Sequence, residues 1–176
     1  MTASLVLAFM GPDRPGLVKT LSETITEAGG SWLESRLAHL AGEFAGIVLV
    51  SVPAPNAAAL VAALRNLEAA GLQITVETSR AAPEAASYRS FELHLIGHDR
   101  PGIVRDVTQA LSQLGVNIEE FSSAIESAPF AGEAMFRAAA RLHVPAGITI
   151  EAVQAALERL ADEIMVDLTA SVGESV

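Results

Sequence analysis

The sequence predicts an α+β fold with two copies of one βαββαβ domain, each an antiparallel four-stranded sheet with two helices on one face. The first observation behind this prediction is an internal repeat, because Gly11–Val18 recurs as Gly97–Val104 with six of the eight residues identical. The second is an apolar, strand-like run before each copy, and the third is apolar residues at helical spacing after it.

The first repeat opens with an expected strand over Leu5–Met10, and a helix follows the motif. The apolar face of that helix is formed by Leu17, Val18, Leu21, Ile25 and Ala28. Pro15 suits its first position, where the missing N–H is not needed. Asp13 can interact with the free N–H groups and the positive helix end. Gly29 suits the left-handed residue that ends a helix.

A hairpin is predicted next, with strands over Trp32–Leu40 and Phe44–Val52 and a turn at Ala41-Gly42. Asn56 can cap a second helix, which Gly71 ends. The inner face of this helix is formed by Leu60, Leu64 and Leu67. Alternation over Leu72–Glu77 predicts the closing strand.

The second repeat has the same order: a strand over Phe91–Ile96, a helix, a strand over Val116–Ser127, a loop over Ala128–Gly132 and a further strand. Its first helix has an apolar face of Ile103, Val104, Val107, Leu111 and Leu114. Asp99, Pro101 and Gly115 take the places of Asp13, Pro15 and Gly29. In the strand after the loop, the inward residues are Phe136, Ala138, Ala140, Leu142 and Val144.

The last helix of the second repeat begins after Thr149, which can cap it, and an alternating strand over Val166–Ala170 closes the pattern. An Ala-rich segment containing Pro83 separates the repeats. We therefore expect domains over residues 1–80 and 90–176 with a linker over 81–89. The adjacent Glu119 and Glu120 fall on successive strand positions, so their carboxylates are expected on opposite faces.

The charge, the residue composition and the missing motifs disfavour several classes of function. The net charge is −10, with 11 Lys and Arg against 21 Asp and Glu, which disfavours direct binding to nucleic acid. The absence of Cys excludes disulfides, thiol catalysis and Cys-based zinc sites. No catalytic, metal-ligand or phosphate-loop motif is found, so we expect no enzyme activity and no cofactor. The apolar N-terminal run lacks a basic start and is too short for a bilayer, so a cytoplasmic location and no membrane association are expected.

A strand leading into Asp-Arg-Pro-Gly-Leu/Ile-Val, then a helix, then Gly115-Val116-Asn117-Ile118, resembles the ACT domain. Both copies together span nearly the whole chain. The run Glu34–Phe44 resembles the glycine cleavage system transcriptional repressor family, whose members consist of two ACT domains. The resemblance implies a ferredoxin-like fold, amino-acid binding at interfaces between domains, and regulation by contact with another protein. In that family the repressor is thought to restrain a DNA-binding activator.

By this resemblance, Asp99, Gly102 and Asn117 match positions that contact amino acids in ACT domains. Asp13 and Gly16 match in the first copy, where Ser31 replaces the Asn. The chemistry suits a zwitterion: the helix start offers N–H groups to a carboxylate, glycine lets the ligand approach, and Asp accepts from an ammonium group. The remaining candidate site residues are Arg14, Pro15, His98, Arg100 and Pro101.

Simpler interpretations stand beside these. Asp before Pro-Gly can be only a cap, Arg14 and Arg100 can pair with nearby loops, and His98 can be a solvated loop residue. We expect an amino-acid-responsive regulator of amino-acid metabolism, with glycine suggested by the resemblance, a partner regulatory protein and a homodimer or larger assembly. The alternatives are a ligand-free double-ACT scaffold, a regulatory subunit of an amino-acid-metabolism enzyme, and a repressor that binds DNA directly.

Overall fold

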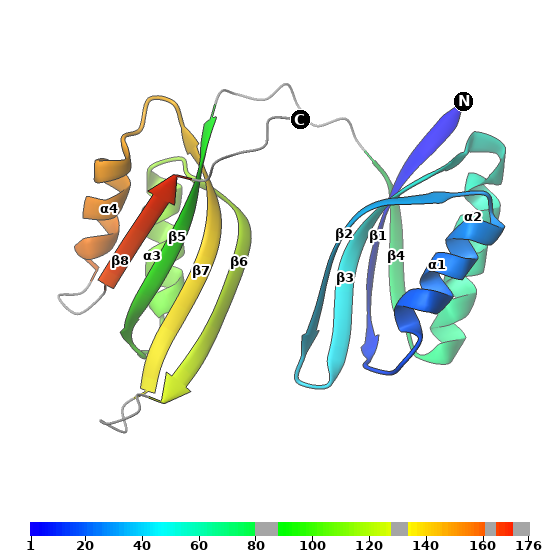
Figure 1. Cartoon of the computed structure of the whole chain (residues 1–176), viewed down its shortest axis with the longest axis horizontal. Helices are drawn as coiled ribbons and strands as arrows, with labels where there is room; N and C mark the ends of the chain where they lie inside the picture. The colour runs from blue at the N-terminus through cyan, green and yellow to red at the C-terminus, as the bar shows by residue number, and fades with distance from the viewer. Residues whose placement is uncertain (80–87, 128–133, 161–164, 171–176) are drawn as a thin grey trace. The chain divides into compact units, whose positions relative to one another are not determined.

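A computed structural model describes residues 1–79, 88–127, 134–160 and 165–170. The chain divides into two units, Met1–Ala82 and Pro83–Val176 (Figure 1). The expected loop over Ala128–Gly132 and most of the expected linker lie outside the described residues. The strand that opens the second unit begins at Tyr88, within the expected linker.

The first unit has the order βαββαβ. Its elements are β1 (Thr2–Pro12), α1 (Leu17–Glu27), β2 (Ser31–Leu40), β3 (Glu43–Pro53), η1 (Ala54–Asn56), α2 (Ala57–Asn66), η2 (Leu67–Ala70) and β4 (Gln73–Thr78), where η is a 3₁₀-helix. The sheet order is β2-β3-β1-β4 and every neighbouring pair is antiparallel. The predicted turn is tight, with left-handed backbone at Ala41 (φ 52°) and Gly42 (φ 86°), which suits a two-residue hairpin.

The second unit repeats this order. Its elements are β5 (Tyr88–His98), α3 (Ile103–Gln113), β6 (Asn117–Ser127), β7 (Ala134–Pro145), α4 (Ile150–Glu158) and β8 (Met165–Ala170). The antiparallel sheet has the order β6-β7-β5-β8. The predicted α+β fold, with two βαββαβ domains, is therefore confirmed.

In each unit the helices lie on one face of the sheet, and a separate apolar core lies between the two layers (Figure 1). The first core includes Leu5, Leu7, Phe9, Leu21, Val50 and Leu60. The second includes Leu93, Leu95, Val107, Leu111, Leu142 and Leu157. The predicted inward residues of β7 are all buried: Phe136, Ala138, Ala140, Leu142 and Val144. Apolar burial of this kind is the main stabilising contribution in each domain.

The two motif helices begin later than predicted. Helix α1 starts at Leu17 and α3 at Ile103, after Gly16 and Gly102 in left-handed backbone with φ of 94° and 86°. Pro15 and Pro101 therefore precede the helices, and the prediction that they occupy the first helical position is wrong. The glycines turn the chain sharply where a side chain would be strained, which delays the helix start.

Val18 and Val104 were predicted in the helix faces that meet the core, but they are 39% and 40% exposed. Because both valines follow the observed helix starts at Leu17 and Ile103, the later starts do not explain their exposure. They lie at the margin of the apolar face of each helix.

Two helix caps differ from each other. Thr149 caps α4 as predicted, because its hydroxyl accepts a hydrogen bond from the Ala152 N–H at 3.2 Å. Asn56 is at the cap position of α2 but makes no side-chain cap bond. Its Nδ2 instead donates to the Ala28 carbonyl at 2.9 Å, which satisfies a free carbonyl at the end of α1.

Bulges in β2 and β6 shift the register between Trp32 and Glu34 and between Ile118 and Glu120. The second bulge overturns the expectation that the two adjacent carboxylates point to opposite faces. Glu119 lies 2.9 Å from His143 and Glu120 lies 3.3 Å from Arg141, on the face of the sheet away from the helices. An extra residue in the strand resets its alternation, which the sequence pattern did not reveal.

Across the described parts of the chain, every helix is too short or too polar to cross a membrane.

Candidate functional site

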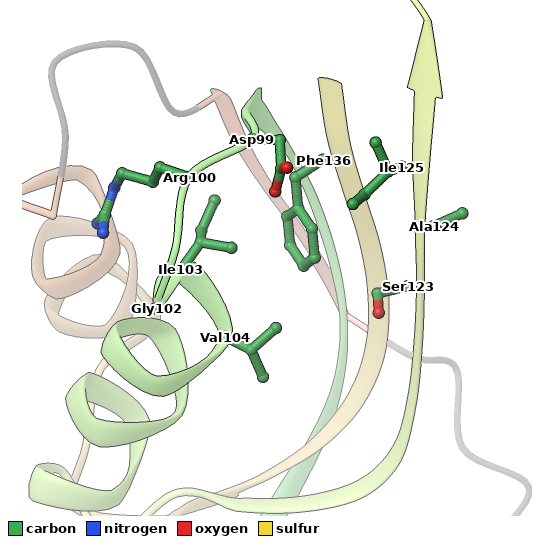
Figure 2. A pocket seen from close by; sticks show the side chains of 9 residues that line it. All are labelled: Asp99, Arg100, Gly102, Ile103, Val104, Ser123, Ala124, Ile125 and Phe136. Carbon is green, nitrogen blue, oxygen red and sulfur yellow. The ribbon is translucent and has the colours of Figure 1, made fainter. Parts of the chain in front are cut away.

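The second unit has an open hollow of about 490 Å³ between the start of α3 and the edge strand β6 (Figure 2). It is lined by Asp99, Arg100, Gly102, Ile103, Val104, Ser123, Ala124, Ile125 and Phe136. The lining therefore combines one end of the repeated motif with the inward face of β6. Three residues of the predicted site are among these: Asp99, Arg100 and Gly102.

Most of the wall of this hollow is apolar. Ile103 and Phe136 are buried at its base, whereas Val104 and Ile125 are exposed, Ile125 at 63%. Figure 2 shows the Asp99 carboxylate beside the Phe136 ring, on the side of the loop that faces β6. The site thus places one anionic group beside a surface that can contact an apolar side chain.

The start of α3 supplies hydrogen-bond donors, which complement the negative charge of Asp99. Gly102 occupies the cap position with no side-chain cap bond, as Gly16 does for α1. Asp13 and Asp99 therefore do not take the cap positions, which belong to Gly16 and Gly102. Free N–H groups at a helix start are partners for a carboxylate. The Ile103 N–H donates to the Arg100 carbonyl at 3.3 Å, and the exposed Arg105 side chain lies over Gly102, with its Nη2 3.1 Å from the place a Cβ would take.

A repeated backbone bond holds the motif loop in both units. The Asp99 N–H donates to the Ala134 carbonyl at 2.9 Å, and the Asp13 N–H donates to the Gly42 carbonyl at 2.8 Å. These bonds fix the loop to the hairpin turn at Gly42 in the first unit and to the start of β7 in the second. The backbone at Asp99 is consequently held in place, and the carboxylate oxygens take no part in that bond.

The two motif arginines have structural partners. Arg100 Nη1 lies 2.7 Å from Asp106 Oδ2, and Arg105 Nη2 lies 2.8 Å from Asp106 Oδ1. Hydrogen bonds from Arg100 and then Arg105 hold the pKa of Asp106 below its usual range. Figure 2 shows Arg100 directed away from the space between α3 and β6. Arg14 Nη2 donates to the Ala70 carbonyl at the end of η2 at 2.8 Å. Arg100 therefore makes an ion pair with the first turn of α3, whereas Arg14 makes a hydrogen bond to a backbone carbonyl.

Asn117 lies far from the hollow in its own domain. It is paired across β7 with His143, which is paired with Ser90 on β5, whereas Asp99 follows the other end of β5. Eight residues of strand separate these rows, which is about 26 Å. One ligand therefore cannot contact both Asn117 and Asp99 of the same domain.

The first unit has the same separation. Ser31 is paired with Ser51 and, through it, with Ser4, while Asp13 follows the far end of β1. Asp13 has a different neighbour, since His39 Nε2 lies 3.8 Å from its carboxylate. The two motif loops are therefore alike in backbone but not in the side chains around the acid.

Sequence reasoning missed the β6 side of the hollow. Ser123 and Ile125 lie on inward positions of an edge strand, and their place opposite α3 depends on strand order and on the bulge at Glu119. His98 ends β5 and is exposed, outside the lining. Among the residues that the structure describes, no group of three His, Asp or Glu could hold a metal ion.

The fold and the motif loops define the class of protein. Residues 3–77 and residues 93–162 each match the ACT domain. The chain belongs to the ACT domain family, with two such domains in tandem, as the repeated motif predicted.

Three proteins of known sequence or structure are similar to this chain over most of its length. The glycine cleavage system transcriptional repressor of Escherichia coli K12 is 28% identical over 162 residues, covering 91% of this chain and 85% of that protein. The crystal structure of an unknown protein from Galdieria sulphuraria matches this chain with a TM-score of 0.82. The two sequences are 34% identical, and the match covers 98% of this chain and 100% of that one. A putative glycine cleavage system transcriptional repressor shares the fold at 20% identity, with a TM-score of 0.69, covering 97% of this chain and 99% of that one.

Proposed function

We propose that this chain is a non-enzymatic, amino-acid-responsive regulator of amino-acid metabolism that acts through contacts with another regulatory protein. The observation that supports this most is the hollow beside Asp99 and the uncapped start of α3. Glycine metabolism is the pathway suggested by the name of the E. coli relative. Glycine is then the first ligand to test.

The proposed ligand is a zwitterion. Its carboxylate would accept from the N–H groups at the start of α3, and its ammonium group would donate to Asp99. A simple anion would be repelled by that carboxylate. The wall formed by Val104, Ile125 and Phe136 leaves room for a side chain, so apolar amino acids have to be tested beside glycine.

Asn117 would join such a site only from a second domain. The edge strand β6 has one unpaired side, and an antiparallel neighbour would bring the start of its own strand toward the end of β6, next to the hollow. A Ser31 or Asn117 from a second copy of this chain would then reach the ligand. The ligand would therefore bind better to the assembled form than to the separate domains.

Preferential binding to one assembly is sufficient for regulation. A ligand shifts an equilibrium only by its difference in affinity between two states. The net charge of −10 favours a protein partner over DNA. No step of this proposal needs a catalytic group.

Thermal unfolding of the full chain with each of the twenty amino acids tests the proposal. A ligand at a hundred times its dissociation constant adds about 2.7 kcal/mol of stability. We expect stabilisation by one or a few amino acids, lost in Asp99→Asn and in Asn117→Ala but kept in Glu92→Gln, a surface acid outside the hollow. No stabilisation by any amino acid would refute the sensing function and favour a ligand-free scaffold.

A further inference from the structure

The outer face of the first sheet, away from α1 and α2, is apolar at its centre. Side chains alternate along a strand, so the residues between the buried positions of β1 and β3 point to this face. We call it the apolar outer face, and it consists of three directly opposed pairs: Val6 with Leu49, Ala8 with Ile47, and Met10 with Ala45.

Two large side chains of the apolar outer face are exposed to solvent. Ile47 is 53% exposed and Met10 is 45% exposed. Polar residues border them on both sides: β2 places Glu34 and Arg36 there, and β4 places Gln73, Thr75 and Glu77. An apolar centre with a polar rim is the usual composition of a protein interface.

The second unit provides an internal comparison, because the repeat places equivalent residues in the same register. At the six matching positions it has Glu92 opposite Arg141, His94 opposite Ala139, and Ile96 opposite Arg137. The same fold thus accepts charged residues on this face. The apolar residues of the first unit are therefore not required for folding, and their presence needs another reason.

From this contrast we propose that the apolar outer face is the contact between two copies of this chain, packed sheet against sheet. The whole outer side of the first sheet, with the polar rim included, covers roughly 600 Å², because its strands are about 4.8 Å apart and six to eleven residues long. Two such faces in contact bury roughly 1,200 Å², which reaches the range of stable interfaces. Sheets pack in this way about 10 Å apart, with strands nearly aligned.

A second copy fits this face because its chemistry is the same. The outer face of the second unit is unsuitable as an apolar partner, since Arg141 is paired with Glu120 at 3.3 Å and Arg137 with Glu126 at 3.3 Å. Covering Arg137 and Arg141, which lie on the central strand β7, with apolar side chains would cost their hydration, whereas the Glu34–Arg36 pair of the first unit, at 3.1 Å, lies on the edge strand β2 in the polar rim. The contact is distinct from the amino-acid hollow, which lies in the other unit on the helix side of its sheet.

Sedimentation velocity of the full chain, from low to high micromolar concentration, tests the proposal. The test variant is Val6→Glu with Leu49→Arg, which copies the Glu92–Arg141 pair of the second unit. The wild type is expected to form an assembly with an even number of chains, and the variant to have half that mass. Its dissociation constant should rise about a hundredfold or more, because the introduced charges would be buried.

Met165→Glu is the matched control, since Met165 is 71% exposed on the outer face of the other sheet, and it should keep the wild-type mass. Circular dichroism checks that the variants are folded. If the double variant does not fold, Ala8→His, which copies His94, serves in its place and should also halve the mass. A folded variant with the wild-type mass, or a wild type that is monomeric throughout, would overturn the proposal.

Discussion

Replacing Gly102 by Ala tests whether the motif loop has the backbone on which the proposed site depends. The residue has φ of 86°, and a Cβ there would lie 3.1 Å from Arg105 Nη2. Left-handed backbone costs an L-residue about 1–2 kcal/mol. The side chain of Arg105 is 75% exposed and can move, so the contact should add little. Gly102→Ala is therefore expected to lower the free energy of unfolding by about 1–2 kcal/mol.

Gly16→Ala provides the matched comparison. It has φ of 94° and nothing within 4 Å of its Cβ, so it isolates the backbone strain. Trp32 is the one Trp of the chain and reports on the first unit, while circular dichroism reports on both. In urea titrations, Gly16→Ala should shift the Trp fluorescence transition, and Gly102→Ala should shift the circular dichroism transition. Neutral or stabilising effects of both changes would refute the left-handed assignment, because Gly→Ala stabilises where the backbone permits it.

Three further changes test local contacts. Thr149→Ala removes the cap of α4 and should cost about 1 kcal/mol in urea unfolding. Asn56→Ala removes the bond to the Ala28 carbonyl and should also lower the free energy of unfolding by about 1 kcal/mol. Asn66→Ala, at the last residue of α2, is its control and should have a smaller effect in the same urea assay. Because Asp106 has a lowered pKa in the folded protein, its contribution is present above the pKa of the unfolded chain and is lost as pH falls through the folded value. Urea midpoints of Asp106→Asn should therefore approach those of the wild type in acid, and a constant difference at all pH values would contradict this assignment.

The architecture of both units could be predicted from the sequence because its signals are local and occur twice. Hydrophobic periodicity placed the strands and helices, and the glycines at positions 29, 71 and 115 marked helix ends, where their φ is positive. The pair Ala41-Gly42 identified the hairpin turn. Each of these signals depends on a few adjacent residues and needs no knowledge of tertiary contacts.

The candidate site could be predicted only in part, because its two sides come from distant segments. The motif located Asp99, Arg100 and Gly102, but the opposite wall depends on the strand order that brings β6 beside α3. The same strand order places Asn117 at the far end of the sheet, a separation that linear spacing does not reveal. The role of Asn56 also differed from that of a simple helix cap, because its partner, the Ala28 carbonyl, is supplied by the tertiary fold.

The most direct test of the proposed function is to locate an amino acid on the chain by ¹H–¹⁵N NMR. Uniformly labelled protein would be titrated with the amino acid that raises the unfolding temperature most, with glycine included in every case. We predict the largest amide shifts at Asp99, Gly102, Ile103 and Val104, at the start of α3, with smaller shifts along Ser123–Ile125. Shifts confined to other segments, or no shifts with any amino acid, would contradict amino-acid sensing at this site.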